Sequence, residues 1–318
     1  MTRSLWLILI PILRNDLKGH WGIWCVPFAL VLLLGANIPS SSSLEEEGDD
    51  CFHVLSPEKE SPAQETLERL ARVYPHVEGP WFEQGDWWIR VNDKVFAWDE
   101  ARMRPQGREL KPNSVSYDFR TYSLFPRNPQ EYTQDMIEKI QNREQRIDEG
   151  LDQRDSAFWD ALYGIPDRET AGKRLVHVRF LGRRVLVNPL LVEPLAQVEQ
   201  RILALETKEI RDWINGLGEV GGFAWRTVSG SGNRSLHSYG VAVDLLPRDF
   251  KGLQAYWRWT RASRDDWWAT PLSGRHSPPR SVIQAFSEEG FVWGGSWVFF
   301  DQFHFEYRPE QVPQYSAE

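Results

Sequence analysis

Residues 234–247 read RSLHSYGVAVDLLP, a stretch that places a histidine and an aspartate seven residues apart across a short apolar strand. Alternate side chains of a strand face opposite sides, so in residues 241–246 Asp244 points away from the valines that flank it. A carboxylate on an apolar strand needs a partner, because burying it unpaired costs several kcal/mol. Gly240 permits a bend that would return His237 over the face of Asp244. The stretch therefore predicts a strand with a polar pair on one side.

A second motif, FFDQFHFEY at residues 299–307, places Asp301 three residues before His304 in an aromatic run. One carboxylate and two imidazoles form a sound set of three protein ligands for zinc, with the fourth position left to water. His237, Asp244 and His304 are therefore candidate zinc ligands, and Asp301 is left as a carboxylate close to that water. Either motif alone is more often structural, since single histidines in strands are usually packed. Together, in order along one domain, the two motifs are much more specific.

The stretches around these motifs predict an α+β fold. Residues 174–187 alternate apolar and polar side chains around Gly182, which predicts two strands joined by a turn. Residues 189–218 carry apolar side chains at helical spacing and predict a helix that ends at Gly216 or Gly218. Short apolar runs among glycine, proline and aromatic residues follow. This order favours α+β over a doubly wound sheet, and the sequence has neither a nucleotide-binding glycine motif nor a serine-hydrolase elbow.

Residues 65–165 are predicted to form a smaller N-terminal accessory region. Residues 65–74 suit a short helix, residues 81–98 a hairpin with an Asn-Asp turn, and residues 130–160 an exposed helix. Tryptophans in the hairpin could stack on sugar rings, but paired aromatic residues more often fill a small core. The sequence assigns this region no role.

The first residues predict export. The apolar segment Trp21–Ile38 carries no charge, three basic residues precede it, and five acidic residues follow it between positions 45 and 50. This asymmetry keeps the N-terminus cytoplasmic and sends the rest across the membrane. Residues 1–39 are therefore a membrane anchor or a cleaved signal segment, and the Ser/Glu/Asp/Pro-rich residues 40–64 a linker. We expect the protein in the cell envelope or periplasm, anchored to the membrane or secreted.

Composition narrows the possible functions. The 318 residues suggest about two domains. A net charge of −8 argues against nucleic acid as a partner, since phosphate contacts need clustered lysine and arginine. The two cysteines exclude a disulfide framework and a CxxC zinc site.

The two motifs together resemble the VanY-type zinc peptidases, which include D-alanyl-D-alanine carboxypeptidases and L-alanyl-D-glutamate endopeptidases. The resemblance covers roughly residues 174–318 and is sharpest in residues 223–245 and 286–308, and we place the peptidase domain at residues 166–318. It rests on the patterns S-x-H-x-x-G-x-A-x-D and D-x-x-H-F-E, here Ser235, His237, Gly240, Ala242, Asp244, Asp301, His304, Phe305 and Glu306. It implies a compact zinc-peptidase domain with an antiparallel sheet that supports the metal.

The resemblance also implies an activity. The family hydrolyses peptidoglycan stem peptides with a zinc-activated water, and its catalytic carboxylate falls on Asp301. Carboxypeptidase members more often have glutamate at that place and endopeptidases aspartate, which favours the endopeptidase branch. By the same resemblance, Arg226 and Ser235 would hold the substrate, either a stem peptide or a muropeptide. For Glu306 two roles stay open, that of a partner orienting a metal ligand and that of a plain salt bridge.

Two other functions are compatible with parts of the sequence. One is a zinc-bearing binding module of the same fold that has lost catalysis. The presence of Asp301 together with all the candidate ligands argues against it. The other is a tryptophan-rich glycan-binding protein without metal, which would require both histidines of the motifs to be structural.

Overall fold

The computed structural model describes residues 62–313, which lie within one compact unit running from Pro57 to the C-terminus. Its mixture of helices and antiparallel sheets confirms the predicted α+β class. The predicted segment Trp21–Ile38 and nearly all of the predicted linker lie outside the described residues. Within residues 62–313, none of the helices combines the length and apolar character needed to cross a membrane.

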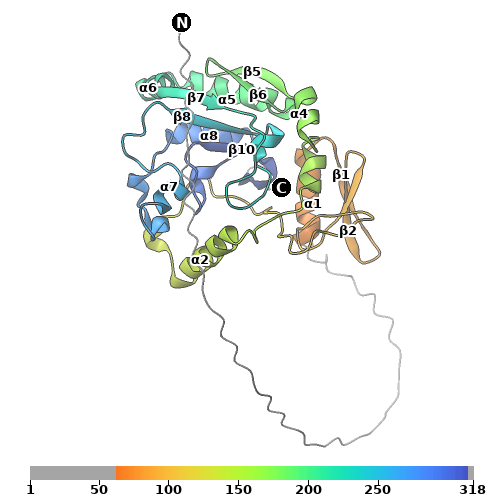
Figure 1. Cartoon of the computed structure of the whole chain (residues 1–318). Helices are drawn as coiled ribbons and strands as arrows, with labels where there is room; N and C mark the ends of the chain where they lie inside the picture. The colour runs from red at the N-terminus through yellow and green to blue at the C-terminus, as the bar shows by residue number, and fades with distance from the viewer. Residues whose placement is uncertain (1–61, 314–318) are drawn as a thin grey trace, which may run out of the picture. The chain divides into compact units, whose positions relative to one another are not determined.

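Eight α-helices and ten strands are described, together with short 3-10 turns, of which one lies in the first motif and one just before the second (Figure 1). The helices are α1 (Pro62–Val73), α2 (Gln134–Asp148), α3 (Ala157–Leu162), α4 (Arg168–Arg174), α5 (Val192–Ala204), α6 (Lys208–Gly216), α7 (Trp257–Arg261) and α8 (Arg280–Glu288). The strands are β1 (Val77–Glu83), β2 (Asp86–Val91), β3 (Lys94–Ala97), β4 (Arg104–Pro105), β5 (Val176–Phe180), β6 (Arg183–Val187), β7 (Leu217–Gly221), β8 (Ala242–Pro247), β9 (Phe291–Trp293) and β10 (His304–Tyr307). The two 3-10 turns are η3 (Leu236–Tyr239) and η6 (Gly294–Ser296).

The strands form three sheets of antiparallel pairs. The first has the order β1-β2-β3-β4, the second is the β5-β6 hairpin, and the third has the order β7-β8-β10-β9. The predicted turns join the strands as expected: an Asn-Asp pair connects β2 to β3, and Leu181 and Gly182, both at positive φ, connect β5 to β6. In Figure 1 the sheet with β7, β8 and β10 lies beside α5 and α8, while β1 and β2 lie beside α1.

The third sheet brings the two sequence motifs together. Strand β10 pairs with β8 so that His304 is directly opposite Asp244 and Glu306 is opposite Ala242. Phe305 points to the other face, where its ring stacks on Phe286 of α8 at a centroid distance of 4.0 Å. One face of the strand pair is therefore packed against a helix, and the opposite face carries the polar residues.

The long helix predicted for residues 189–218 is interrupted, and the prediction of one continuous helix was wrong. Helix α5 ends at Ala204, Glu206 takes a positive φ of 47°, and the hydroxyl of Thr207 caps a new helix by accepting from Ile210 N at 3.2 Å. A threonine cap competes with continued helix by offering the free N–H groups an acceptor. The predicted stop at Gly216 is correct for α6.

One hydrophobic core joins the accessory segment to the sheet that carries the motifs. Its buried side chains include Phe96 and Phe158 from the N-terminal part and Phe180, Val243 and Phe305 from the C-terminal part. The domain division predicted at residue 165 stays a prediction, while in the structure side-chain packing is continuous across that position.

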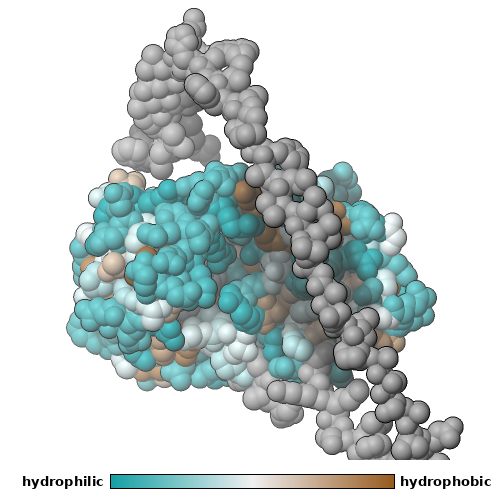
Figure 2. All heavy atoms as spheres, turned by 90° about the horizontal axis from the view of Figure 1, so that it is seen from below, coloured by the Kyte–Doolittle hydropathy of each residue, from teal (hydrophilic) through white to brown (hydrophobic). Residues whose placement is uncertain are grey.

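A second, smaller core consists of Ile140, Trp257, Trp267 and Phe300, and it fixes α2 against the segment that leads into β10. Most tryptophans near it serve packing, as the fully buried Trp267 shows. On the face of the molecule seen in Figure 2, hydrophilic residues predominate and the visible hydrophobic residues form small patches. The described residues thus keep most of their large apolar side chains inside.

Candidate metal centre

Three side chains converge on one point at the polar face of the third sheet. His237 Nε2 lies 3.0 Å from Asp244 Oδ1, His304 Nδ1 lies 3.0 Å from the same oxygen, and the two ring nitrogens are 3.2 Å apart. The structure therefore brings the three predicted zinc ligands together, and among residues 62–313 they are the one group of this kind that could hold a metal ion.

The local backbone explains why His237 faces the strand. It lies in η3, whose first N–H groups are capped by the Ser235 hydroxyl, which accepts from His237 N at 3.3 Å. Gly240 ends this turn at a φ of +68°, and a Cβ there would lie 2.6 Å from Leu175 Cδ2 and 2.7 Å from Asn188 N. Only glycine fits this bend, so the motif needs Gly240 to return the chain into β8 with His237 above it.

Both histidines have the ring nitrogen that faces away from the centre bound to an acceptor. His237 Nδ1 lies 2.6 Å from the carbonyl oxygen of Gly222, and His304 Nε2 lies 3.0 Å from Glu306 Oε2. Each outer nitrogen therefore donates its N–H, which leaves the lone pair of the inner nitrogen for a cation. The geometry supports both roles left open for Glu306, because its carboxylate accepts from His304 Nε2 and also lies 3.5 Å from Arg308 Nη1.

The donor set fits zinc. A tetrahedral zinc ion with bonds of about 2.0–2.1 Å holds its ligand atoms about 3.3 Å apart. The observed separations of 3.0 to 3.2 Å between the three inner atoms are close to that spacing. A shared cation would accept a lone pair from each of the two imidazole nitrogens and from the carboxylate oxygen at once.

The charges within the cluster shift the pKa values of Asp244 and His304. Burial disfavours the charge of Asp244, but His237 and His304 outweigh it and hold the pKa of this carboxyl far below its usual range. Burial also disfavours the charged form of His304, but the hydrogen bonds to Asp244 and Glu306 prevail and raise its pKa to about 10. The centre therefore attracts positive charge, which a divalent cation would supply.

Asp301 lies beside the centre on the turn that precedes β10. Its backbone N–H donates to the Gly294 carbonyl at 3.0 Å, and a Cβ on Gly294 would lie 2.7 Å from the Asp301 carbonyl oxygen. The absence of a side chain at Gly294 is thus what lets Asp301 approach the turn that follows β9. Burial raises the pKa of Asp301 to about 6, with the charge of Asp244 adding to that rise and His304 opposing it.

The two residues expected to hold substrate differ in their surroundings. Arg226 is exposed, and its backbone N–H is fixed by the Ser238 hydroxyl at 2.9 Å, so its guanidinium is presented to solvent from an anchored position. Ser235 is buried and its hydroxyl caps η3. The structure gives Ser235 a clear part in positioning His237, and its expected contact with substrate stays a prediction.

Two residues near the centre were not anticipated from the sequence. The Tyr256 hydroxyl lies within the electrostatic reach of both Asp301 and Arg226, and an isolated bridge pairs Tyr256 with Asp301. The Trp297 ring lies 5.6 Å from the His304 ring. Tyr256 precedes Asp301 by many residues and has no motif around it, so only the pairing of distant segments places it here.

A buried charged chain links the centre to the accessory segment. Arg308 lies 3.5 Å from Glu306 Oε1 and donates to Glu310 at 2.5 Å, and Glu310 accepts from the hydroxyl of Tyr74 at 2.8 Å. Tyr74 follows α1 directly. Glu306, which binds His304, is therefore held by groups that extend into the N-terminal part.

These features describe an α+β domain with a candidate His/Asp/His metal centre and an adjacent carboxylate. Residues 229–307 match the family model described as D-alanyl-D-alanine carboxypeptidase, which confirms the resemblance to the VanY-type peptidases. The matched segment contains the three candidate ligands and Asp301 but begins just after Arg226. The curated proteins yield no match to this chain, and neither do the solved structures. The family match indicates a peptidase.

Proposed function

We propose that the protein is a zinc-dependent peptidase that hydrolyses peptidoglycan stem peptides, as a D-Ala-D-Ala carboxypeptidase or an L-Ala-D-Glu endopeptidase. The observation that carries the proposal is the convergence of His237, Asp244 and His304 within 3.2 Å of one another, next to Asp301. The family match over residues 229–307 supports the same class of reaction.

In this proposal His237, Asp244 and His304 hold the zinc ion. Bound there, zinc would polarise the scissile carbonyl and lower the pKa of a water molecule towards about 7. The Gly222 carbonyl and Glu306 keep both imidazoles in the tautomer that ligation requires, with the proton on the outer nitrogen.

Asp301 acts as the proton carrier. It accepts a proton on a carboxylate oxygen as water attacks the peptide carbonyl, and it then returns that proton to the leaving nitrogen. Burial raises the pKa of Asp301 to about 6 in the metal-free protein, and a bound zinc ion would lower it, so the carboxylate would be charged and able to accept the proton. Asp301 has few competing partners, since its carboxylate accepts only a long 3.4 Å contact from Phe303 N among the described residues.

Arg226 recognises the substrate in this proposal. A stem peptide carries free carboxylates, and a guanidinium can form two parallel charge-assisted hydrogen bonds to one of them. The anchored backbone and exposed side chain of Arg226 suit that role. Ser235 would contribute in two ways. Its hydroxyl caps η3, and, as the family resemblance implies, it would also contact the substrate.

An exported location belongs to the same proposal. The charge asymmetry around Trp21–Ile38 would send residues 40–318 across the membrane, where peptidoglycan is found. Whether that segment stays as an anchor or is removed as a signal does not alter the chemistry at the centre.

Incubation of the purified protein with defined muropeptides, followed by mass spectrometry of the products, tests the proposal. Loss of the terminal D-Ala would identify a carboxypeptidase, and cleavage after L-Ala an endopeptidase. A protein that holds zinc but cleaves neither bond would instead be the binding module without catalysis, and a protein that holds no zinc would refute the metal centre.

A further inference from the structure

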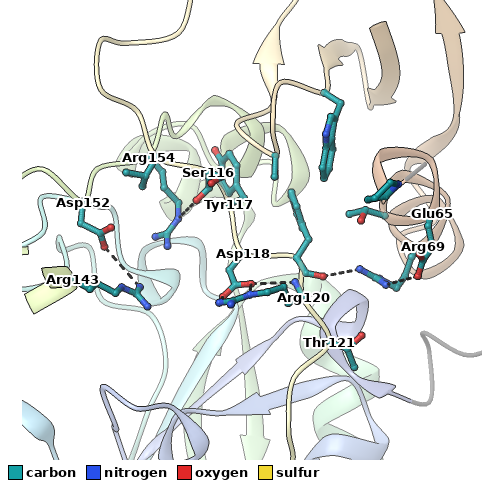
Figure 3. Close-up of a pocket in the computed structure, with 16 residues that line it drawn as sticks. Glu65, Arg69, Ser116, Tyr117, Asp118, Arg120, Thr121, Arg143, Asp152 and Arg154 are labelled. Carbon is teal, nitrogen blue, oxygen red and sulfur yellow. Dashed lines mark hydrogen bonds and ion pairs between the residues drawn. The ribbon is translucent and has the colours of Figure 1, made fainter. Parts of the chain in front are cut away.

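A cavity of about 600 Å³ lies in the N-terminal part, away from the three candidate ligands. Its walls come from α1, from residues 115–121 and from α2 with the loop that follows it. Four arginines line it, namely Arg69, Arg120, Arg143 and Arg154. In Figure 3 Arg143 and Arg154 lie on one side and Arg69 on the other, with the Asp118–Arg120 pair between them.

The four arginines are unequally compensated by carboxylates. Arg120 is fully paired, with two nitrogens bound to the two oxygens of Asp118 at 2.9 and 2.7 Å. Arg143 approaches Asp152 only to 3.9 Å. Arg154 makes no ion pair within residues 62–313, and one backbone acceptor, Ser116 O at 3.2 Å from its Nε, is the hydrogen-bond partner of its side chain there.

Unused donors therefore face this cavity. Both terminal nitrogens of Arg154 are without a hydrogen-bond acceptor in the described part of the chain. Arg69 is 7% exposed: its Nη2 donates to Phe119 O at 2.7 Å, its Nη1 lies 3.6 Å from Glu65 Oε1, and its Nε has no partner among residues 62–313. Arg154 is half-buried and Arg69 is buried, and both guanidinium groups keep donors that no acceptor among residues 62–313 uses, so an oxyanion is the partner that they indicate. Burial and the charges of Arg143 and Arg308 lower the pKa of Arg154, with Asp152 opposing them, which agrees with an excess of positive charge.

The lining also restricts the kind of anion. Asp152 and Glu65 border the same space as the arginines. Their negative charges would repel a doubly charged phosphate. A ligand with a carboxylate and a nearby ammonium or amide group would instead pair with both the arginines and these acidic side chains. The side chains of Trp98 and Tyr117 add apolar surface. Groups of both signs beside aromatic rings are what a short peptide with free carboxylates requires.

We infer that this cavity binds a carboxylate of a short zwitterionic peptide, with Arg154 and Arg143 as the recognising cations. The inference rests on the proposed function, because it assigns to the accessory region a part of the peptide substrate remote from the bond that is cut. The wall of the cavity is hydrogen-bonded to the loop that precedes the first motif. Arg154 N donates to Asn233 Oδ1 at 2.8 Å, and Asn233 Nδ2 donates to the Asp152 carbonyl at 2.5 Å.

Isothermal titration calorimetry of the full chain with γ-D-glutamyl-L-lysine tests the inference. This dipeptide carries two carboxylates and two ammonium groups, and neither proposed cleavage applies to it. We expect it to bind, and its diamide, which lacks both carboxylates, to bind at least about tenfold more weakly. Arg154→Gln should weaken dipeptide binding by a similar factor, whereas Arg184→Gln, at an exposed arginine of β6, should leave it unchanged.

Further variants separate the cavity from the metal centre. Removal of zinc should leave dipeptide binding intact, so a failure to cleave muropeptides would refute the peptidase without touching this site. Arg143→Gln, at an exposed position of α2, replaces Arg154→Gln if the latter does not fold. Equal binding of the diamide, tighter binding of inorganic phosphate, or no effect of either arginine change would overturn the inference.

Discussion

Replacement of Asp301 by asparagine separates the proposed proton carrier from the proposed ligands. Asparagine keeps the size of the side chain and an oxygen that can still accept the 3.4 Å contact from Phe303 N. It cannot accept a proton from the attacking water. We therefore expect kcat to fall by about 10²–10⁴, the usual contribution of a positioned general base, with zinc content unchanged.

The stability of the variant follows from the sign of the pKa shift. Burial raises the pKa of Asp301 to about 6, so its charged form is disfavoured in the folded protein and lowers stability above the pKa of the unfolded chain. A neutral amide removes that cost. The metal-free Asp301→Asn protein should thus unfold at the same temperature as the unmodified protein or at a higher one.

The assay measures zinc by atomic absorption and muropeptide hydrolysis on the same preparation. His237→Ala is the matched control, because loss of a ligand should lower zinc content and activity together. Asp301→Glu should keep part of the activity, since the longer arm retains the carboxylate but misplaces it. If Asp301→Asn loses its zinc, Asp301 is a ligand; if it stays fully active with zinc bound, the proton carrier is another group, and Glu306 becomes the first candidate.

Three other changes test neighbouring parts of the structure. Arg226→Ala should lower kcat/KM about tenfold or more at unchanged zinc content, and Arg226→Lys should restore little, because a point charge cannot form a paired contact with a carboxylate. Gly240→Ala should lower the free energy of unfolding by more than about 1 kcal/mol and weaken zinc binding, since the added Cβ meets Leu175 and Asn188 at a φ of +68°. Asp155→Asn should destabilise the fold by about 1–2 kcal/mol at pH 7 in denaturant unfolding, because it removes the charge from the paired contacts of 2.7 and 2.9 Å with the partly exposed Arg108.

Each of these has a result that would contradict it. Unchanged kcat/KM in Arg226→Ala would remove that arginine from the site, and full zinc content with native stability in Gly240→Ala would refute the argument from the bend. For Asp155, burial is outweighed by Arg108, so its folded pKa is depressed and its contribution is present above the unfolded value near ~3.9. The difference between Asp155→Asn and the unmodified protein should therefore shrink as the pH falls below that value; a constant difference would contradict the ion pair.

Local rules were enough to predict the candidate ligands. Side chains alternate between the two faces of a strand. Asp244 is therefore predicted to face away from its neighbouring valines in β8, and His304 and Glu306 to share one face of β10. The turn at Gly182 and the bend at Gly240 could also be predicted, because each depends on a backbone conformation that few residues other than glycine adopt readily. These features are properties of a few consecutive residues.

The remaining features depend on contacts between distant parts of the chain. The pairing of β10 with β8 decides that His304 meets Asp244, and the Gly222 carbonyl and Glu306 decide which nitrogen of each histidine faces the centre. The arginine cavity draws its walls from α1, residues 115–121 and α2, which no sequence spacing relates to one another. Such contacts gain their free energy only when the whole core is packed, so the tertiary structure alone decides them.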